Sequence, residues 1–275
     1  MADVAERVAE HYTLGTLDGA IRQGLEKLGV TGDPTLDQLA AVDEFHMGGR
    51  AATAELAGAL GLAAGHRLLD IGCGLGGTAR YLAATFGVTV DGVDLTPEFI
   101  AVGTALTARL GLADRVRLTE GNALRLPFAA GSFDAATLLH VGMNIADKAA
   151  LFAGIAQVLR PGGVLAVYDV MRTGDAPLAY PVAWAADAGT SFLASPADYR
   201  AALQRAGFET TPEIDRRDMA LAGFKAMKTR LAEQGPPPLG LHLLMGAQAP
   251  AKVANMVANL ESGTIAPVQI VARRR

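Results

Sequence analysis

The stretch that decides the fold is Leu68-Leu69-Asp70-Ile71-Gly72-Cys73-Gly74-Leu75-Gly76-Gly77. An apolar run ends at an acidic residue, closely spaced glycines follow, and a helical pattern begins at Gly77. A strand, a tight glycine turn and a helix in this order bring a ligand close to the backbone and to a helix N-terminus. The stretch therefore predicts a ligand-binding turn between the first strand and the first helix of an α/β sheet.

On the C-terminal side of this turn, strands and helices alternate. Strands are expected at 67–71, 89–93, 116–120, 133–139 and 164–170, with helices at 77–86, 97–110 and 147–159 between them. Such βαβ repetition predicts an α/β fold with a Rossmann-like, doubly wound, mostly parallel sheet. Strands at 208–214 and 266–272 would make it seven-stranded. Ligands of such a sheet bind beyond the carboxyl ends of the strands.

The remaining segments are expected to be helical. Residues 1–60 are predicted to form an N-terminal helical cap, because apolar residues recur there at helical spacing. The core is expected at 61–216, with an irregular lid insertion at 172–194 and a helix at 195–206. Residues 217–262 are predicted as a helical substrate lid, with helices at 218–233 and 241–260, and 263–275 as the last strand. Along the second lid helix, four residues with i, i+3, i+4, i+7 spacing are interpreted as packing residues: Val253, Met256, Val257 and Leu260.

Composition argues against several classes of function. The net charge is −4 and the basic run, Arg273–Arg275, is confined to the end of the chain, so no nucleic-acid partner is expected. The single cysteine, Cys73, allows neither an intrachain disulfide nor a cysteine-based zinc site, and no metal is predicted. We see no signal peptide and no stretch that could span a bilayer. We therefore expect a soluble cytoplasmic enzyme, monomeric or homodimeric, without a membrane partner.

Two classes of ligand fit this glycine turn. Gly72, Gly74 and Gly77 satisfy the G-x-G-x-x-G pattern of dinucleotide binders, and Asp94 ends the second strand, where a carboxylate accepts from ribose hydroxyls. Asp70 distinguishes between the two classes of ligand. A pyrophosphate beside it would meet a like charge, at a cost of ~1–3 kcal/mol, whereas S-adenosylmethionine presents an ammonium and a sulfonium. The acidic residue favours S-adenosylmethionine; an NAD-dependent oxidoreductase and a catalytically silent cofactor-binding protein remain alternatives.

The turn resembles the first motif of class I S-adenosylmethionine-dependent methyltransferases, in which an acidic and an apolar residue precede Gly-x-Gly-x-Gly. Asp70, Gly72, Gly74 and Gly76 match that motif, and Gly121-Asn122-Ala123 matches the third. Asn122 stands where the family usually has Asp, so only a neutral carbonyl oxygen can accept from the adenine amino group. The resemblance implies that these residues bind the cofactor: Asp70, Gly72, Cys73, Gly74, Gly76, Asp94, Leu95, Asn122, Ala123, Leu139 and His140.

Around the core, the arrangement resembles small-molecule methyltransferases of the ubiquinone-biosynthesis, phosphoethanolamine, glycine/sarcosine and sugar O-methylating types. This implies in-line methyl transfer to a nitrogen or oxygen of a small molecule, with S-adenosylhomocysteine as product. His140 is the candidate general base for a hydroxyl acceptor, since its unperturbed pKa lies near neutrality; a role confined to the cofactor shell remains open. Candidate acceptor-binding residues, each with packing or capping as the alternative, are Tyr12, His46, Met143, Asn144, Tyr180 and Trp184.

Overall fold

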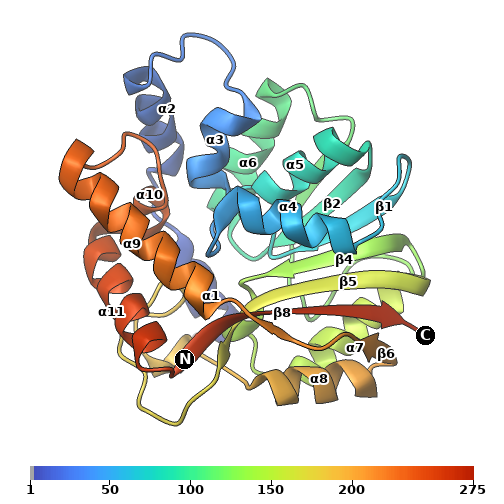
Figure 1. The fold of residues 1–275 in the computed structure, drawn as a ribbon. Helices are drawn as coiled ribbons and strands as arrows, with labels where there is room; N and C mark the ends of the chain where they lie inside the picture. The colour runs from blue at the N-terminus through green and yellow to red at the C-terminus, as the bar shows by residue number, and fades with distance from the viewer. Residues whose placement is uncertain (1–2) are drawn as a thin grey trace.

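The central element is a mixed β-sheet with the strand order β3-β2-β1-β4-β5-β8-β6, beside which β7 pairs with β8 (Figure 1). The computed structural model describes residues 3–275; Met1 and Ala2, at the start of the predicted cap, lie outside the described residues. The strands are β1 Arg67–Ile71, β2 Thr89–Asp94, β3 Val116–Glu120, β4 Phe133–Leu139, β5 Leu159–Arg172, β6 Phe208–Thr210, β7 Ile214–Asp215 and β8 Ile265–Arg274. The predicted Rossmann-like, mostly parallel sheet is confirmed: β1 to β5 are parallel, and β8 runs antiparallel to β5.

Alternation along the strands explains why helices cover both faces of the sheet. Leu68 packs in a cluster with α4 and α5, whereas its neighbour Leu69 packs with α7 and α8 on the other face. The helices that cover the sheet are α4 Gly49–Ala59, α5 Gly77–Phe86, α6 Pro97–Arg109, α7 Lys148–Val158 and α8 Pro196–Arg205. Because both faces are covered, ligands reach the sheet at the ends of its strands.

Segments from both ends of the chain pack together beside the sheet. The N-terminal cap contains α1 Val4–Tyr12, α2 Leu17–Lys27 and α3 Leu36–Asp43, followed by α4. After the sheet's β7 come α9 Arg217–Gln234, α10 His242–Met245 and α11 Ala249–Glu261. Leu17, Ile21 and Leu25 of α2 share a buried cluster with Leu239 and Leu244, so the cap and the last helices form one layer. Figure 1 shows this layer on the left, against one end of the sheet.

Two predicted elements are broken in the structure. The helix expected at 241–260 divides into α10, a 3₁₀ turn at Gly246–Gln248 and α11, because Gly246 adopts φ 67°. The strand expected at 208–214 divides into β6 and β7, which pair with different parts of β8; Pro212 between them has no N–H to donate to a ladder. Within residues 3–275, no helix is both long and apolar enough to cross a membrane.

Candidate active site

A cavity of about 2230 Å³ opens over the carboxyl ends of β1, β2 and β4. Its walls come from the glycine turn, from the loops after these strands, from the join between α3 and α4, and from α1 and α9 to α11. Small-molecule sites usually measure about 300–1,000 Å³. This cavity can therefore hold two small molecules side by side.

The glycine turn is tied to the neighbouring strand by backbone hydrogen bonds. The N–H groups of Gly72 and Cys73 both donate to Val93 O, at 2.7 and 3.1 Å. Gly74 adopts φ 53° and a Cβ there would meet nothing within 4 Å, so its backbone faces open space in the cavity. The buried Cys73 thiol lies against Gly92 of β2, where a Cβ would come within 2.8 Å of its sulfur. The turn thus exposes backbone to the cavity while being held from behind.

Asp94 completes this turn from the end of β2. Its Oδ2 accepts from Gly74 N at 2.9 Å, and its Oδ1 accepts from Thr96 N at 2.9 Å. Each carboxylate oxygen has a second lone pair, so both can accept another hydrogen bond from the cavity. Burial raises the pKa of Asp94, and the backbone donors act against that rise. Leu95 lies next to it in the cavity wall.

Asp70 presents an unpartnered carboxylate oxygen at the end of β1. The residue is 2% exposed; its Oδ1 accepts from Thr137 Oγ1 at 2.7 Å, and its Oδ2 is buried without a partner. Burial raises the pKa of Asp70 to about 7, with Glu44 and Asp94 adding repulsion. A buried oxygen without a donor carries a desolvation cost that a cationic group in the cavity removes.

Asn122 lies in the cavity wall after β3, together with Ala123. Its side-chain oxygen accepts from Leu124 N at 2.8 Å, so the amide forms a local turn. The resemblance of Gly121-Asn122-Ala123 to the third methyltransferase motif implies that this oxygen accepts from the adenine amino group. Only its second lone pair and the amide N–H₂ remain for a ligand.

The loop after β4 carries His140 in the left-handed region, with φ 55°. Its backbone N donates to Tyr168 O at 2.7 Å, and its ring Nδ1 lies 3.1 Å from the same oxygen. Because a carbonyl only accepts, Nδ1 carries the ring proton, and Nε2 has the lone pair. Met47 N lies 3.4 Å from Nε2, a long contact. Burial, followed by repulsion from His46, lowers the pKa of His140 to about 3.

Tyr12, Asn144 and Trp184 form a continuous wall on the other side of the cavity. Tyr12 OH donates to Asn144 Oδ1 at 3.1 Å, and Asn144 Nδ2 donates to Trp184 O and Thr190 O, both at 2.9 Å. Trp184 Nε1 donates to Ser191 Oγ, so the indole presents only its apolar ring. Leu139 and Met143 also lie in the wall. The polar groups of these side chains are bonded to one another, to backbone oxygens or to Ser191, and they leave a largely apolar surface.

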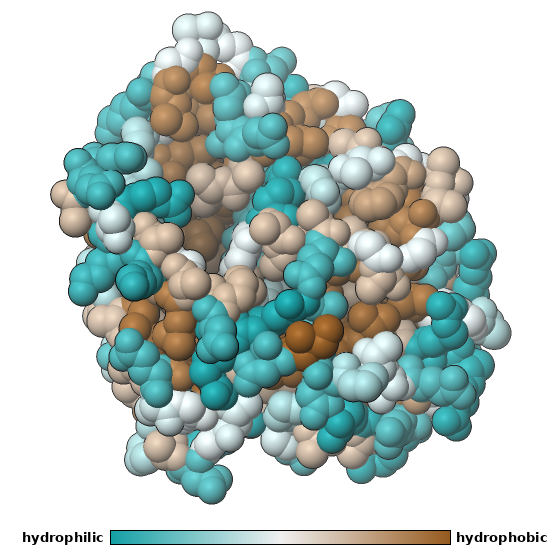
Figure 2. Space-filling model, in the orientation of Figure 1, coloured by the Kyte–Doolittle hydropathy of each residue, from teal (hydrophilic) through white to brown (hydrophobic). Residues whose placement is uncertain are grey.

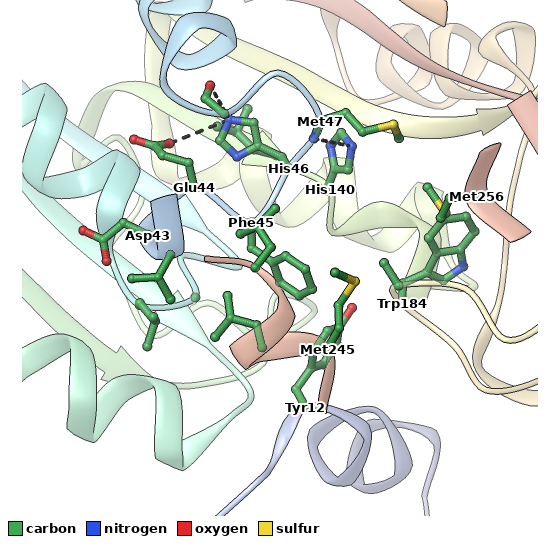
Figure 3. A pocket seen from close by; sticks show the side chains of 18 of the residues that line it. Tyr12, Asp43, Glu44, Phe45, His46, Met47, His140, Trp184, Met245 and Met256 are labelled. Carbon is green, nitrogen blue, oxygen red and sulfur yellow. Dashed lines mark hydrogen bonds and ion pairs between the residues drawn. The ribbon is translucent and has the colours of Figure 1, made fainter. Parts of the chain in front are cut away.

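The join between α3 and α4 carries a buried polar network, part of which Figure 3 shows. His46 Nε2 lies 3.2 Å from Gly49 O and 3.1 Å from Thr53 Oγ1, while Thr53 donates to Glu44 Oε2. Burial lowers the pKa of His46. Beside it, Asp43 and Arg80 form an ion pair of 2.7 Å in which both side chains are fully buried. These contacts hold the join over the glycine turn.

Two predicted site residues lie away from the cavity. Gly76 forms the left-handed N-cap of α5, where a Cβ would come within 2.7 Å of Leu118. The third glycine of the motif is therefore needed for packing. Tyr180 packs on the apolar cluster around Met256 and Leu260 and does not reach the cavity wall. The cofactor contact predicted for Gly76 and the acceptor contact predicted for Tyr180 remain predictions.

Several wall residues were missed or interpreted otherwise by sequence reasoning. Thr137 donates to Asp70 from the adjacent strand, and no local motif marks it. Met47 and Met245 line the cavity, as do Val253, Met256 and Val257, which were expected only to pack. Their spacing indicated one helix face but not what that face contacts. No cluster of three or more metal-ligating side chains occurs in residues 3–275.

The known proteins that this chain resembles are methyltransferases. Residues 69–167 match the methyltransferase domain family. The chain is 34% identical over 134 residues to methyltransferase GfsG of Streptomyces halstedii, covering 49% of this chain and 48% of that protein. It is 36% identical over 118 residues to erythromycin 3''-O-methyltransferase of Saccharopolyspora erythraea, covering 42% and 39%. The chain thus spans about half or less of the length of these curated relatives.

Solved structures share the fold over nearly the whole chain. Geranyl diphosphate C-methyltransferase from Streptomyces coelicolor A3(2) superposes with a TM-score of 0.73 at 19% identity, covering 100% of this chain and 99% of that one. A putative sarcosine dimethylglycine methyltransferase from Galdieria sulphuraria gives 0.70 at 20% identity, covering 93% and 98%. Residues 69–167 therefore match the methyltransferase domain family, and the whole chain shares the fold of these solved methyltransferases.

Proposed function

We propose that the chain is an enzyme that transfers the methyl group of S-adenosylmethionine to a nitrogen or oxygen of a small-molecule acceptor. The observation that carries the proposal is the buried, unpartnered Oδ2 of Asp70 at the edge of the glycine turn. A cationic amino-acid group satisfies this oxygen, whereas a diphosphate would be repelled by it. The same observation argues against an NAD-dependent oxidoreductase.

The residues of the cavity wall fit the cofactor. Asp70 would hold its ammonium group, and the free lone pairs of Asp94 would accept from the ribose hydroxyls. Leu95 and Ala123 would pack on the adenine, with Asn122 at its polar edge. When bound, S-adenosylmethionine supplies a methyl group on a positively charged sulfur. Because that charge is lost during transfer, a cavity wall that excludes water favours the reaction.

On the acceptor side, we assign His140 as general base when the acceptor is a hydroxyl group. Its Nε2 has the lone pair at neutral pH, because the Nδ1 proton is held by Tyr168 O and the ring pKa is lowered. An amine acceptor would enter in its neutral form and need no base. We also place the enzyme in the cytoplasm, since its single cysteine, Cys73, is buried and unpaired.

Asp94→Ala is expected to weaken S-adenosylmethionine binding about ten- to hundred-fold, the size of one lost hydrogen-bonding carboxylate. The substitution removes the ribose acceptor and leaves Gly74 N without its partner. Titration calorimetry with S-adenosylmethionine measures the change. Asp91→Ala is the matched control, because Asp91 lies on the same strand but pairs with Arg67 outside the cavity. Equal affinity of the Asp94→Ala variant and the control would refute the assignment.

The affinity for S-adenosylmethionine is expected to depend on pH through Asp70. Its pKa is raised to about 7, so the carboxylate that attracts the ammonium is lost as the pH falls through that value. Affinity should therefore rise several-fold between about pH 6 and pH 7.5. Asp70→Asn should bind more weakly at the upper pH and show a flat profile, while Asp91→Asn keeps the slope. If the affinity of Asp70→Asn still rose with pH, Asp70 would not be the origin of the pH dependence.

A further inference from the structure

The cavity has a second half, which we call the acceptor chamber. It is bounded by Tyr12 of α1, Met47 of the α3–α4 join, Met143 and Trp184 of the loops after β4 and β5, and Met245 and Met256 of the last helices. Figure 3 shows these side chains, apart from Met143, around one space beside His140. The chamber adjoins the part of the cavity that is lined by the glycine turn, Asp70 and Asp94, which we call the cofactor half. A molecule in the chamber would therefore lie next to the reacting end of the cofactor.

Charged side chains in the cavity wall are distributed unequally. Those with buried or half-buried carboxylates all belong to the cofactor half: Asp43, Glu44, Asp70 and Asp94. The other charged wall residues are all exposed, at the rim: Asp3, Arg125, Asp147, Lys225, Lys228, Arg230 and Glu261. Among the described residues, no charged side chain therefore lines the chamber interior, and the charges of Asp94 and Asp169 act on Tyr12 only from behind or beside its wall. An ammonium or phosphate group held there would lose its hydration without a partner, which costs several kcal/mol.

The chamber wall suits apolar groups of more than one shape. Met47, Met143, Met245 and Met256 line it, and methionine is flexible and polarisable, so it fits irregular apolar surfaces. Trp184 adds a flat ring whose N–H is already bonded to Ser191. Tyr12 OH is likewise bonded to Asn144. The wall thus offers contact area and few free hydrogen-bonding groups.

Apolar side chains continue from the chamber to the cavity mouth along α9. Leu221, Phe224 and Leu231 lie in the cavity wall at helical spacing, and Leu231 is 48% exposed. Figure 2 shows brown, apolar side chains within the hollow beside α9 and α10. An apolar ligand that extends from the chamber to the mouth would cover these side chains. The wall therefore fits a ligand larger than an amino acid.

The polar atom that borders the chamber is His140 Nε2, which accepts a long hydrogen bond of 3.4 Å from Met47 N; a hydroxyl group of the acceptor would replace this bond. A neutral imidazole accepts a hydrogen bond from a hydroxyl group. The chamber thus combines an apolar wall with one acceptor at the cofactor side.

From these observations we infer that the methyl acceptor is an uncharged, mainly apolar molecule with a ring system, methylated on a hydroxyl oxygen beside His140. The inference rests on the proposed function. In the step, the hydroxyl proton passes to His140 Nε2, the oxygen–methyl bond forms and the sulfur–methyl bond breaks. The products are a methyl ether, S-adenosylhomocysteine and protonated His140, which returns its proton to water. Glycine derivatives and phosphoethanolamine, both charged, are not expected as acceptors.

Binding of two matched probes tests the inference without turnover. Naphthol and naphthylmethylamine share one ring system, but at neutral pH the first is uncharged and the second is an ammonium. Each is titrated by fluorescence into the protein saturated with S-adenosylhomocysteine, which has no methyl group to transfer. Naphthol is expected to bind at least about ten-fold more tightly, because no charged side chain among the described residues lines the chamber interior to pair with the ammonium. Equal or tighter binding of the ammonium would overturn the inference.

The variant Met245→Gln tests whether naphthol binds in the acceptor chamber. Glutamine has nearly the length of methionine but a polar end, so naphthol should bind about ten-fold more weakly, with the affinity for S-adenosylhomocysteine unchanged. Ile214→Gln is the control: Ile214 is 44% exposed on β7, outside the cavity wall, and should leave naphthol binding within about two-fold. Unchanged naphthol binding in Met245→Gln would mean that the chamber is not the site.

Failure of the inference and failure of the proposed function give different results. If calorimetry detects no binding of S-adenosylhomocysteine, the proposed function fails. If the cofactor product binds and glycine or phosphoethanolamine releases S-adenosylhomocysteine from S-adenosylmethionine while naphthol does not, methyl transfer stands and the acceptor class is wrong. Release of S-adenosylhomocysteine with naphthol as the acceptor supports both the proposed function and the inference about the acceptor.

Discussion

Arg80→Met is expected to lower the free energy of unfolding by about 3–5 kcal/mol, the usual cost of breaking a buried ion pair. Arg80 donates to Asp43 Oδ1 at 2.7 Å, to Thr107 Oγ1 at 2.9 Å and to Gly103 O at 3.1 Å, and its side chain is fully buried. Burial already raises the pKa of Asp43, with Arg80 acting against the rise. Without Arg80, Asp43 keeps its desolvation cost and loses its partner. Denaturant unfolding measures the change.

Two further variants separate this origin from a general effect of removing arginine. Arg67→Met breaks an exposed pair with Asp91 and should cost only about 0–1 kcal/mol. In the double variant Arg80→Met with Asp43→Leu, neither charge remains, and much of the lost stability should return. A double variant as unstable as the sum of its single variants would show that the two residues act independently.

The ion pair also bears on the site, because Asp43 lies directly on the first residue of α5. A Cβ at Gly77 would come within 2.4 Å of Asp43 Cβ and of its carbonyl oxygen. The join that carries Glu44 and His46 is therefore packed against the glycine turn. Loss of Arg80 should loosen this contact and weaken cofactor binding as well as stability.

Local patterns predicted most of the sheet. The strands at 67–71, 116–120 and 133–139 and the helix at 77–86 have the predicted bounds, because each has a regular apolar period and a clear turn residue at its end. The long helix expected at 241–260 failed at Gly246, since glycine within a helical pattern is compatible with either a helix or a break. The backbone conformation there is set by packing, which the sequence does not display.

The candidate site was predictable where one motif defined it, and not where distant segments meet. The positions of Asp70 and Asp94 follow from the ends of adjacent strands. The partners of the buried carboxylates do not follow from local sequence: Thr137 lies 67 residues from Asp70, and Arg80 lies 37 residues from Asp43. The apolar chamber was missed for the same reason, because Tyr12 and Met245 come from opposite ends of the chain. Only the tertiary structure brings them together.

His140→Asn is expected to lower kcat for a hydroxyl acceptor about 10²-fold, the lower end of the usual contribution of a general base, because a ring whose pKa is about 3 is a weak base. Asparagine tolerates the left-handed backbone at φ 55° and retains a side-chain N–H for Tyr168 O, so the loop should keep its shape. What it lacks is an imidazole lone pair. Turnover is measured as release of S-adenosylhomocysteine, and calorimetry with S-adenosylmethionine should show a much smaller change in affinity.

The pH profile distinguishes this role from one confined to binding. Because burial lowers the pKa of His140 to about 3, its base form persists from neutral pH down toward that value and is lost only below it. The wild-type kcat should therefore show no fall near pH 6.5, where an exposed histidine protonates. The groups that face the ring, Tyr168 and His46, do not supply such a fall either, since burial lowers the pKa of His46 and raises that of Tyr168 to above its ordinary range. A kcat that falls through pH 6.5 in the wild type but not in His140→Asn would show an imidazole in contact with water. An unchanged kcat in His140→Asn would show that His140 is not the general base and that the hydroxyl proton passes to solvent.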